Sequence, residues 1–186
     1  MLIDREILAA VDAGDLLIEP GFNLSSRIQP ASLDVRLGNR FGVRRRRFEI
    51  IDPKVDSTDD WLFVTVSDHG HFTIGPGELV LAATLESVGL ADTLLARVEG
   101  KSSLGRLGLM VHATAGFIDP GWALAPITLE LSVLGGPMKL YPGMPVAQLA
   151  FQKVEPVSSG YSGKYVGQGA PTPSRFHENW TGTVWT

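Results

Sequence analysis

Cysteine is absent from the 186 residues of this chain. Disulfide bonds, thiolate catalysis and metal sites built on cysteine are therefore excluded. The sequence has no apolar run long enough to span a membrane, and its first residues lack the apolar stretch of a signal peptide. These absences predict a cytoplasmic protein without a membrane partner.

A large excess of charge of either sign is also missing. The chain has 16 Lys and Arg residues against 20 Asp and Glu residues, so its formal net charge is −4. This balance disfavours general nucleic-acid binding, although local cations can still hold a small anion. The hydrophobic fraction of 44% is typical of a folded protein, and this length usually forms one domain. We therefore expect a single domain over residues 1–186.

Short apolar segments separated by glycine and proline dominate the chain. Residues 4–13 predict a short helix that Asp4 caps and Gly14 ends. Beyond this helix, segments such as 33–37 alternate apolar and polar side chains, as a β-strand does. Many short strands of this kind are typical of a β-sandwich or a β-barrel.

The connections between these strands follow from turn chemistry. Three Pro-Gly pairs, at 76–77, 120–121 and 142–143, favour type II turns because glycine readily adopts a positive φ. The polar segment 52–70 is predicted to be a long loop, and the segment 90–95 one helical turn.

Two segments are predicted to lie outside the core. The basic run 44–47 is interpreted as a solvated hairpin tip, with phosphate attraction or subunit contact as the alternative. From Ser158 onward Gly, Ser, Pro and Thr dominate, so the tail 158–186 is expected to bury little until a ligand orders it.

The segment 100–106 carries the densest chemistry of the chain. It reads Gly-Lys-Ser-Ser-Leu-Gly-Arg, which places two cations and two hydroxyls beside two glycines. Backbone N–H groups approach a ligand closely at glycine, and Lys and Arg supply charge-assisted hydrogen bonds, so the turn suits a polyphosphate. Taken alone, it is equally well explained as surface decoration. Two later carboxylates, Asp119 and Glu130, suit the binding of a sugar hydroxyl and the transfer of protons.

The order of these segments resembles a known family. The segments that carry the resemblance are Gln29–Leu37, Glu99–His112, Thr114–Gly121, Thr128–Leu131, Gln148–Leu149, Lys164–Gln168 and Pro171–Arg175. From Ile3 to about Ser174 the chain is similar to the dCTP deaminase branch of the trimeric dUTPase superfamily. The resemblance implies a mainly β, distorted jelly-roll or β-barrel-like fold with a short N-terminal helix. It also implies a homotrimer with active sites between subunits and the tail 158–186 closing over bound nucleotide.

The resemblance gives roles to three residues that act on the base. Glu130 is expected to be the catalytic acid/base that shuttles protons while water attacks C4 of cytosine. Ser102 and Arg106 are expected to position this water or to stabilise the developing charge. Glu130 also lies in an apolar, strand-like segment, where a carboxyl more readily gains a proton. Without the resemblance, a solvent-facing strand glutamate is the favoured interpretation.

Substrate-binding residues follow from the same resemblance. Asp119 is expected to accept the deoxyribose 3′-OH, and Trp122 packs either on the sugar or in the core. The main chain at Thr128 and Leu129 is expected to read the pyrimidine edge, and the cationic turn and the tail to hold the triphosphate. The full expected set is Lys101, Ser102, Ser103, Leu104, Gly105, Arg106, Asp119, Thr128, Leu129, Glu130, Gln148, Tyr161, Lys164 and Gln168.

The expected metal use is magnesium without zinc. Zinc-dependent nucleobase deaminases use His and Cys ligands, and this chain has no cysteine. The close pair His69 and His71 is better interpreted as part of a polar loop. Magnesium would bind through the substrate phosphates and water, so no protein metal ligand is predicted.

The pair Gly116 and Phe117 separates the subtypes of the family. Monofunctional relatives that release dUTP usually carry a His-Arg pair at this place, whereas bifunctional relatives resemble the Ala-Gly-Phe-Ile-Asp sequence found here. The resemblance therefore implies that dCTP is converted to dUMP, ammonia and diphosphate, with dUTP as an intermediate and dTTP as a feedback ligand. The product dUMP serves thymidylate synthesis. Alternatives are a monofunctional deaminase and a weakly catalytic, nucleotide-binding regulatory trimer.

Three departures from the family pattern accompany the resemblance. The segment 123–126 replaces a shorter stretch that normally includes glycine, and Val133 stands where asparagine is common. The tail is also short between Tyr161 and Lys164. The first departure lies between Asp119 and Glu130, so it bears directly on how these two carboxylates are placed.

Overall fold

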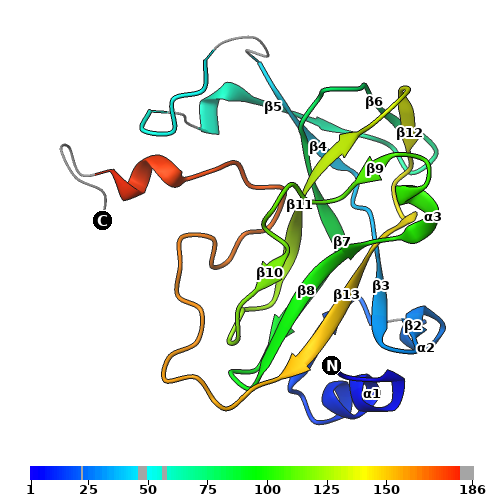
Figure 1. Ribbon diagram of the computed structural model, residues 1–186, viewed down its shortest axis with the longest axis vertical. Coiled ribbons are helices and arrows are strands. Elements are labelled where there is room, and N and C mark those ends of the chain that lie inside the picture. The colour runs from blue at the N-terminus through cyan, green and yellow to red at the C-terminus, as the bar shows by residue number, and fades with distance from the viewer. Residues whose placement is uncertain (22, 46–49, 56–57, 181–186) are drawn as a thin grey trace.

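The architecture was obtained from a computed structural model, which describes residues 1–21, 23–45, 50–55 and 58–180. Two antiparallel β-sheets account for most of the strands (Figure 1). The first sheet consists of β5 (Trp61–Thr65), β4 (Arg40–Arg44), β7 (Val80–Leu90), β11 (Ala125–Val133) and β9 (Leu109–Met110), with β1 (Leu16–Glu19) paired to β7. The second consists of β10 (Phe117–Ile118), β8 (Leu94–Gly100), β13 (Pro145–Lys153), β3 (Ser32–Arg36) and β2 (Ile28–Gln29).

Smaller elements complete the described chain. A two-stranded sheet joins β12 (Met138–Leu140) and β6 (Phe72–Ile74). The helices are α1 (Asp4–Asp12), α2 (Leu24–Arg27), α3 (Ser102–Gly105) and the 3-10 turns η1 (Thr58–Asp60) and η2 (Phe176–Asn179). None of the described helices is long and apolar enough to cross a membrane.

One hydrophobic core is built from both sheets. It follows the strand period, because alternate side chains of β11 (Ile127, Leu129 and Leu131) are buried. Leu33, Leu149 and Phe151 of the second sheet belong to the same buried cluster. The mainly β fold is therefore confirmed. Neither sheet closes into a barrel in the part of the chain that the structure describes.

The N-terminal helix is confirmed, but its cap is not Asp4. Helix α1 begins at Asp4 with Ile3 as the N-cap, and the Glu6 carboxylate accepts the Ile3 N–H at 3.0 Å. Gly14 follows the helix with φ +79°, a conformation that ends helices at low cost for glycine.

Two further predictions for connecting segments are wrong. The predicted loop 52–70 contains η1 and strand β5, which pairs with β4 from Trp61 to Thr65. The predicted helical turn 90–95 is a tight turn, in which Leu94 N–H donates to Ala91 and the chain passes from β7 to β8. Polar neighbours hide β5 in the sequence, because this strand is defined by its pairing with β4 and not by a local apolar pattern.

The Pro-Gly turns are confirmed. Gly77, Gly121 and Gly143 all have positive φ, between 74° and 79°. Two of these turns also close with the expected hydrogen bond, from Glu78 N–H to Gly75 and from Met144 N–H to Tyr141.

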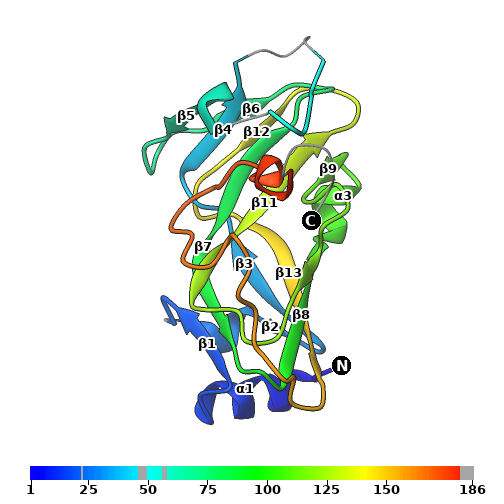
Figure 2. The same ribbon diagram turned by 90° about the vertical axis from the view of Figure 1, so that its left-hand side faces the viewer.

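The C-terminal tail runs back over the first sheet instead of leaving the molecule. Figure 2 shows the described part of the tail crossing in front of the strands. Pro171 and Pro173 are buried, so this segment buries more than its composition predicts. Residues 46–47 of the basic run and 181–186 of the tail lie outside the described residues.

Candidate active site

A pocket of about 450 Å³ lies where β10, β11 and the tail meet. It contains six of the residues predicted from the sequence. They are Phe117, Asp119, Thr128, Glu130, Tyr161 and Gln168. A more open groove of about 860 Å³ lies between the Gly38–Arg40 region and the tail, but of the predicted residues it is lined only by Gln168. The smaller pocket is therefore the candidate active site.

Strand β11 directs two side chains, those of Thr128 and Glu130, into the pocket. Its burial alternates along nine residues, so Thr128 and Glu130 face away from the core while Leu129 is fully buried. The Glu130 carboxylate accepts the Ala113 N–H at 2.9 Å, and the Glu130 N–H donates to the Val111 carbonyl. A charged oxygen held by a backbone donor keeps a fixed direction, which a proton-transferring group needs.

Asp119 also lines the pocket and directly follows β10. Close by, the rings of Trp122 and Tyr161 pack with centroids 4.9 Å apart and an interplanar angle of 42°. The Tyr161 N–H donates to the Pro120 carbonyl at 2.9 Å, which fixes the start of the tail beside Asp119. Trp122 packs against the core and also lines the pocket, so the two sequence interpretations of this residue are compatible.

Gln168 joins the tail to β11. Its side-chain amide donates to the Pro126 carbonyl at 2.7 Å and accepts the Thr128 hydroxyl at 3.3 Å. The Thr172 N–H in turn donates to the Thr128 hydroxyl oxygen. Three contacts between two segments therefore form one polar wall of the pocket.

Lys164 does not point into the pocket of its own chain. Its ammonium donates to the Arg175 carbonyl and to the Asn179 side chain, while the Arg175 guanidinium donates to the Lys164 carbonyl. Arg175 also pairs with Glu178 at 2.5 Å, and this hydrogen bond lowers the pKa of Glu178. This group of contacts, here called the tail clasp, holds residues 164–179 together.

The cationic turn, residues 100–106, lies away from the candidate pocket. In Figure 1, α3 is at one edge of the molecule and the C-terminal tail is at the opposite edge. Ser102, Ser103 and Arg106 are exposed on this turn, and the Arg106 guanidinium donates to the Ser102 hydroxyl at 3.3 Å. Within one chain, then, the residues predicted to act together on the base are divided between two surfaces.

A second polar cluster surrounds Asp34 near the turn. The Asp34 carboxylate pairs with the Lys101 ammonium at 2.6 Å and accepts the Gln148 amide at 3.1 Å and the Gln29 amide at 3.4 Å. Two predicted triphosphate ligands, Lys101 and Gln148, are thus held by one carboxylate. Sequence reasoning assigned no role to Asp34. Asp34 occupies a polar position of an alternating strand, which predicts exposure, so the sequence pattern did not mark this residue.

Other pocket residues were also missed. Tyr165, Thr172 and Ser174 of the tail line the pocket, and the Tyr165 hydroxyl accepts the Arg175 N–H at 3.1 Å. All three lie in segments that carry the family resemblance, but no local pattern indicates their contacts, which form only when the tail folds back.

Among the described residues, no group of three or more His, Asp or Glu side chains lies close enough together to hold a metal ion. His71 is exposed, with its ring 5.7 Å from that of Tyr141.

Comparison with models of known protein families establishes the family of the chain. A family model described as dCTP deaminase-like matches residues 1–154. The chain belongs to the dCTP deaminase family. The resemblance seen in its motifs is thereby confirmed.

Individual relatives agree with this assignment. A protein of Corynebacterium glutamicum (strain R) named "dCTP deaminase, dUMP-forming" is 49% identical over 187 residues, covering 96% of this chain and 97% of that protein. A relative of the same name from a Nocardioides species is 45% identical, with 96% of each chain covered.

A solved structure shares the fold. The crystal structure of 2′-deoxycytidine 5′-triphosphate deaminase from Agrobacterium tumefaciens aligns with a TM-score of 0.64 at 25% identity. The alignment covers 83% of this chain and 47% of that one, so this chain spans about half of the solved chain.

Two departures from the family pattern have clear positions in the structure. Ala125 and Pro126 begin β11, and the Pro126 carbonyl accepts Gln168. Val133 is 2% exposed and pairs with Leu109 of β9, so it contributes to the core of the first sheet. The altered segment thus lies between Asp119 and Glu130 and also contacts the tail.

Proposed function

We propose that this chain converts dCTP to dUMP, ammonia and diphosphate, using two water molecules. One water replaces the 4-amino group of cytosine, and a second attacks the α-phosphorus and expels diphosphate. The observation that carries this proposal is the pocket in which Glu130, oriented by the Ala113 N–H, shares one cavity with Asp119 and Thr128. Full-length relatives named "dCTP deaminase, dUMP-forming" support the same reaction.

Glu130 is assigned the proton transfers of deamination. It takes a proton from the water that attacks C4 and delivers a proton to the departing amine, so that ammonia leaves. Ser102 and Arg106 position this water and stabilise the developing charge. The main chain at Thr128 and Leu129 contacts the pyrimidine edge.

Asp119 is assigned to the deoxyribose. Its carboxylate accepts the 3′-OH, and the wall formed by Trp122 and Tyr161 lies against the sugar. A ribose would bring an additional hydroxyl against this aromatic wall, where it would lose its water without gaining a partner. The pocket therefore favours deoxyribonucleotides.

The triphosphate is assigned to Lys101, Ser103 and Gln148, with Tyr161, Lys164 and Gln168 from the tail. Lys164 must leave the tail clasp or meet a neighbouring chain in order to reach it. A magnesium ion would be held by the phosphate oxygens and water. It would supply positive charge that neutralises the leaving diphosphate.

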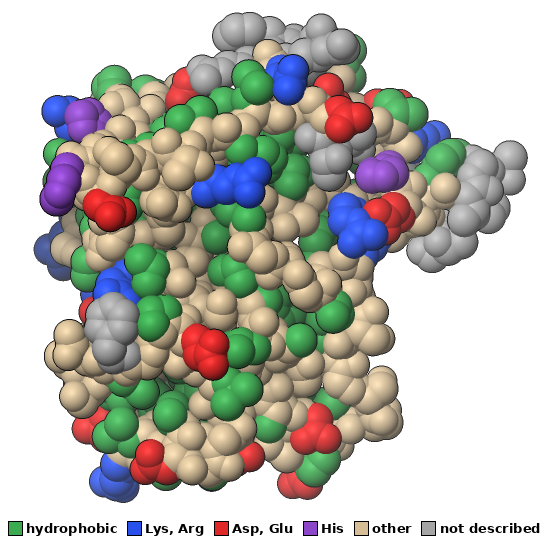
Figure 3. Space-filling view, turned by 180° about the vertical axis from the view of Figure 1, so that it is seen from behind, with side chains coloured by type: hydrophobic (Ala, Val, Ile, Leu, Met, Phe, Trp, Pro, Cys, Tyr) green, Lys and Arg blue, Asp and Glu red, His purple; other side chains and the backbone are tan. Residues whose placement is uncertain are grey.

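We assign a homotrimer, which would unite the divided site. A turn carrying Ser102 and Arg106 from one chain would meet Glu130 of the next, and the tail 158–186 would close the site. Large apolar side chains are available for such contacts. Leu107, Leu134 and Leu79 are 67%, 66% and 48% exposed, and Figure 3 shows hydrophobic side chains spread over one face of the molecule. The chain would act as one cytoplasmic domain over residues 1–186.

Gly116 is assigned to the second step. A Cβ atom here would lie 3.0 Å from the Val98 carbonyl oxygen and 3.1 Å from His112 Nε2. A larger residue therefore requires a shift of the Val98 carbonyl, of the His112 side chain or of the loop 112–116 itself, which also carries the Ala113 N–H that holds Glu130. Glycine preserves this loop and the backbone beside Phe117, where a water is assigned to attack the α-phosphorus.

Product analysis tests the proposal directly. With dCTP and magnesium, we expect dUMP to accumulate together with equal amounts of ammonia and diphosphate, as measured by chromatography and parallel assays. Stoichiometric dUTP without diphosphate would instead show a monofunctional deaminase. Tight nucleotide binding with no ammonia would show a regulatory trimer.

A further inference from the structure

The pairing of β11 with β7 is interrupted at one position beside the pocket. Pro126 pairs with Ser87 and Thr128 pairs with Ala83, so residues 84–86 of β7 all stand opposite Ile127. This is a β-bulge, and such irregularities recur where a sheet must aim a side chain. The next two outward residues of β11 are Thr128 and Glu130.

The Thr84 side chain supplies the hydrogen bond that the interrupted ladder cannot. Its hydroxyl oxygen accepts the Ile127 N–H at 2.9 Å, and its proton is donated to the Glu86 carbonyl at 2.6 Å. Thr84 is 3% exposed, so no water competes freely for these groups. Without the hydroxyl, a buried backbone N–H would lack its partner, which is costly in a folded protein.

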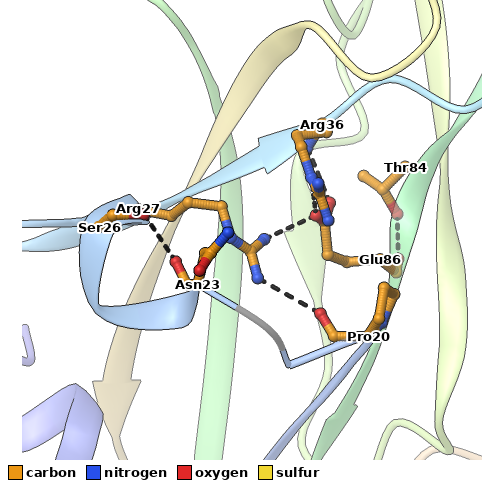
Figure 4. Close-up of polar contacts among 7 residues, drawn as sticks. All are labelled: Pro20, Asn23, Ser26, Arg27, Arg36, Thr84 and Glu86. Carbon is orange, nitrogen blue, oxygen red and sulfur yellow. Dashed lines mark hydrogen bonds and ion pairs between the residues drawn. The ribbon is translucent and has the colours of Figure 1, made fainter.

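Glu86 fixes the other end of the bulge. Its side chain is fully buried, and its carboxylate binds Arg27 Nη1 and Arg36 Nε at 2.6 Å each and the Arg36 N–H at 2.7 Å (Figure 4). Arg36 belongs to β3 of the second sheet, and Arg27 to α2. Burial lowers the pKa of Arg27, and the Glu86 carboxylate opposes this shift. The bulge is therefore anchored across both sheets and cannot slide without leaving a buried charge unpaired.

The bulge influences the pocket through the two residues that flank Ile127. Ile127 lies between Pro126, whose carbonyl holds Gln168, and Thr128, whose hydroxyl contacts Gln168 and Thr172. A shift of the Ile127 main chain would move both contacts and the strand that carries Glu130.

We propose that Thr84 is a positioning residue for the reaction. Its hydrogen bond to the Ile127 N–H fixes the position of β11, so that Thr128 contacts the base and the Glu130 carboxylate contacts the attacking water. This inference rests on the deaminase function proposed above. It assigns Thr84 no contact with substrate.

The test compares Thr84→Val, which removes the hydroxyl at nearly constant shape, with Thr84→Ser, which keeps it. Ile7→Val, a buried change in α1 away from the pocket, controls for lost core packing. Each purified full-length protein is assayed for ammonia release from dCTP, for inhibition by inorganic tripolyphosphate, and for hydrogen exchange of the Ile127 amide.

For Thr84→Val we expect kcat to fall about tenfold or more, because small misplacements of a reacting group are costly. Tripolyphosphate inhibition should weaken much less than kcat, since Lys101, Ser103 and Gln148 lie on other elements and only Gln168 of the assigned triphosphate residues contacts β11. The Ile127 amide should exchange faster. Thr84→Ser and Ile7→Val should both keep the kcat of the unmodified protein.

Three results would overturn the inference. They are an unchanged kcat in Thr84→Val, equal loss in Thr84→Ser, or parallel loss of tripolyphosphate inhibition. If the unmodified protein releases no ammonia, the proposed function fails instead. Unchanged Ile127 exchange in Thr84→Val would then still refute the structural role of Thr84, independently of activity.

Discussion

The Ala113 backbone N–H donates to the Glu130 carboxylate at 2.9 Å, across 17 positions of sequence. This contact joins the loop that contains Gly116 to the strand that contains the proposed acid/base. The two proposed chemical steps, deamination and diphosphate release, therefore depend on one small piece of backbone. A substitution in the loop should therefore displace Glu130, and a substitution at Glu130 should disturb the loop.

Replacing Glu130 tests the acid/base assignment. In Glu130→Gln the amide oxygen can still accept the Ala113 N–H, so the side chain should keep its place and nucleotide binding should persist. Ammonia release should fall by about a hundredfold to ten-thousandfold, the usual contribution of a general acid/base. Glu155→Gln, which changes an exposed carboxylate after β13, is the matched control. Ammonia release from Glu130→Gln at the unmodified rate would show that another group transfers the protons.

Replacing Gly116 tests the coupling of the two steps. Gly116→Arg should suppress diphosphate release at least as strongly as ammonia release, because the new side chain fills the water site and displaces the loop that orients Glu130. Gly136→Ala is the control, since no atom lies within 4 Å of the added Cβ and its φ is not positive. Both products are measured from the same dCTP incubation. Diphosphate release that survives in Gly116→Arg would contradict the role of this glycine.

Mixing two inactive variants tests whether the site is shared between chains. Glu130→Gln and Arg106→Met should each be inactive alone. If Arg106 of one chain serves Glu130 of another, random assembly of equal amounts into trimers should restore about a quarter of the sites. Light scattering establishes the trimer in parallel. Trimers that assemble without any regain of ammonia release would place Arg106 and Glu130 in the same chain or remove Arg106 from the reaction.

Metal removal tests the expected cofactor use. Chelation of zinc should leave ammonia release intact, since the sequence offers no cysteine ligand. Removal of magnesium should slow the reaction by disturbing the triphosphate. Ammonia and diphosphate are assayed after exhaustive stripping and readdition of single metals. Recovery with zinc alone would require a different mechanism.

The candidate site was predictable where its residues follow strand periodicity and motif order. Thr128 and Glu130 are two residues apart on a strand, so their common face could be predicted, and Asp119 directly precedes the Pro120-Gly121 turn. The resemblance implied a tail that closes over bound nucleotide, but the contacts of the tail with β11 could not be predicted. Gln168 bonds to Pro126 across 42 positions, and the composition of the tail resembles that of any polar segment.

The cationic turn shows the opposite case. Its chemistry is evident from Lys101, Ser102 and Arg106, but its location apart from Glu130 is not. Asp34 binds Lys101 and Gln148 at once, but in the sequence it is an ordinary polar residue of an alternating strand.

The sequence by itself determined the family, the mainly β fold and the residue types available for chemistry. The family follows from the order of the motifs, and the fold class follows from alternation along strands and glycine in turns. The available chemistry follows from the residue types, including the absence of cysteine. The tertiary structure alone decided that Thr84 and Glu86 form an anchored bulge beside Ile127, and that the predicted site residues divide between two surfaces. Such relationships depend on long-range pairing of β7 with β11 and of the tail with the sheet. No local pattern specifies these pairings, because the free energy that selects them is gained only when distant segments bury one another.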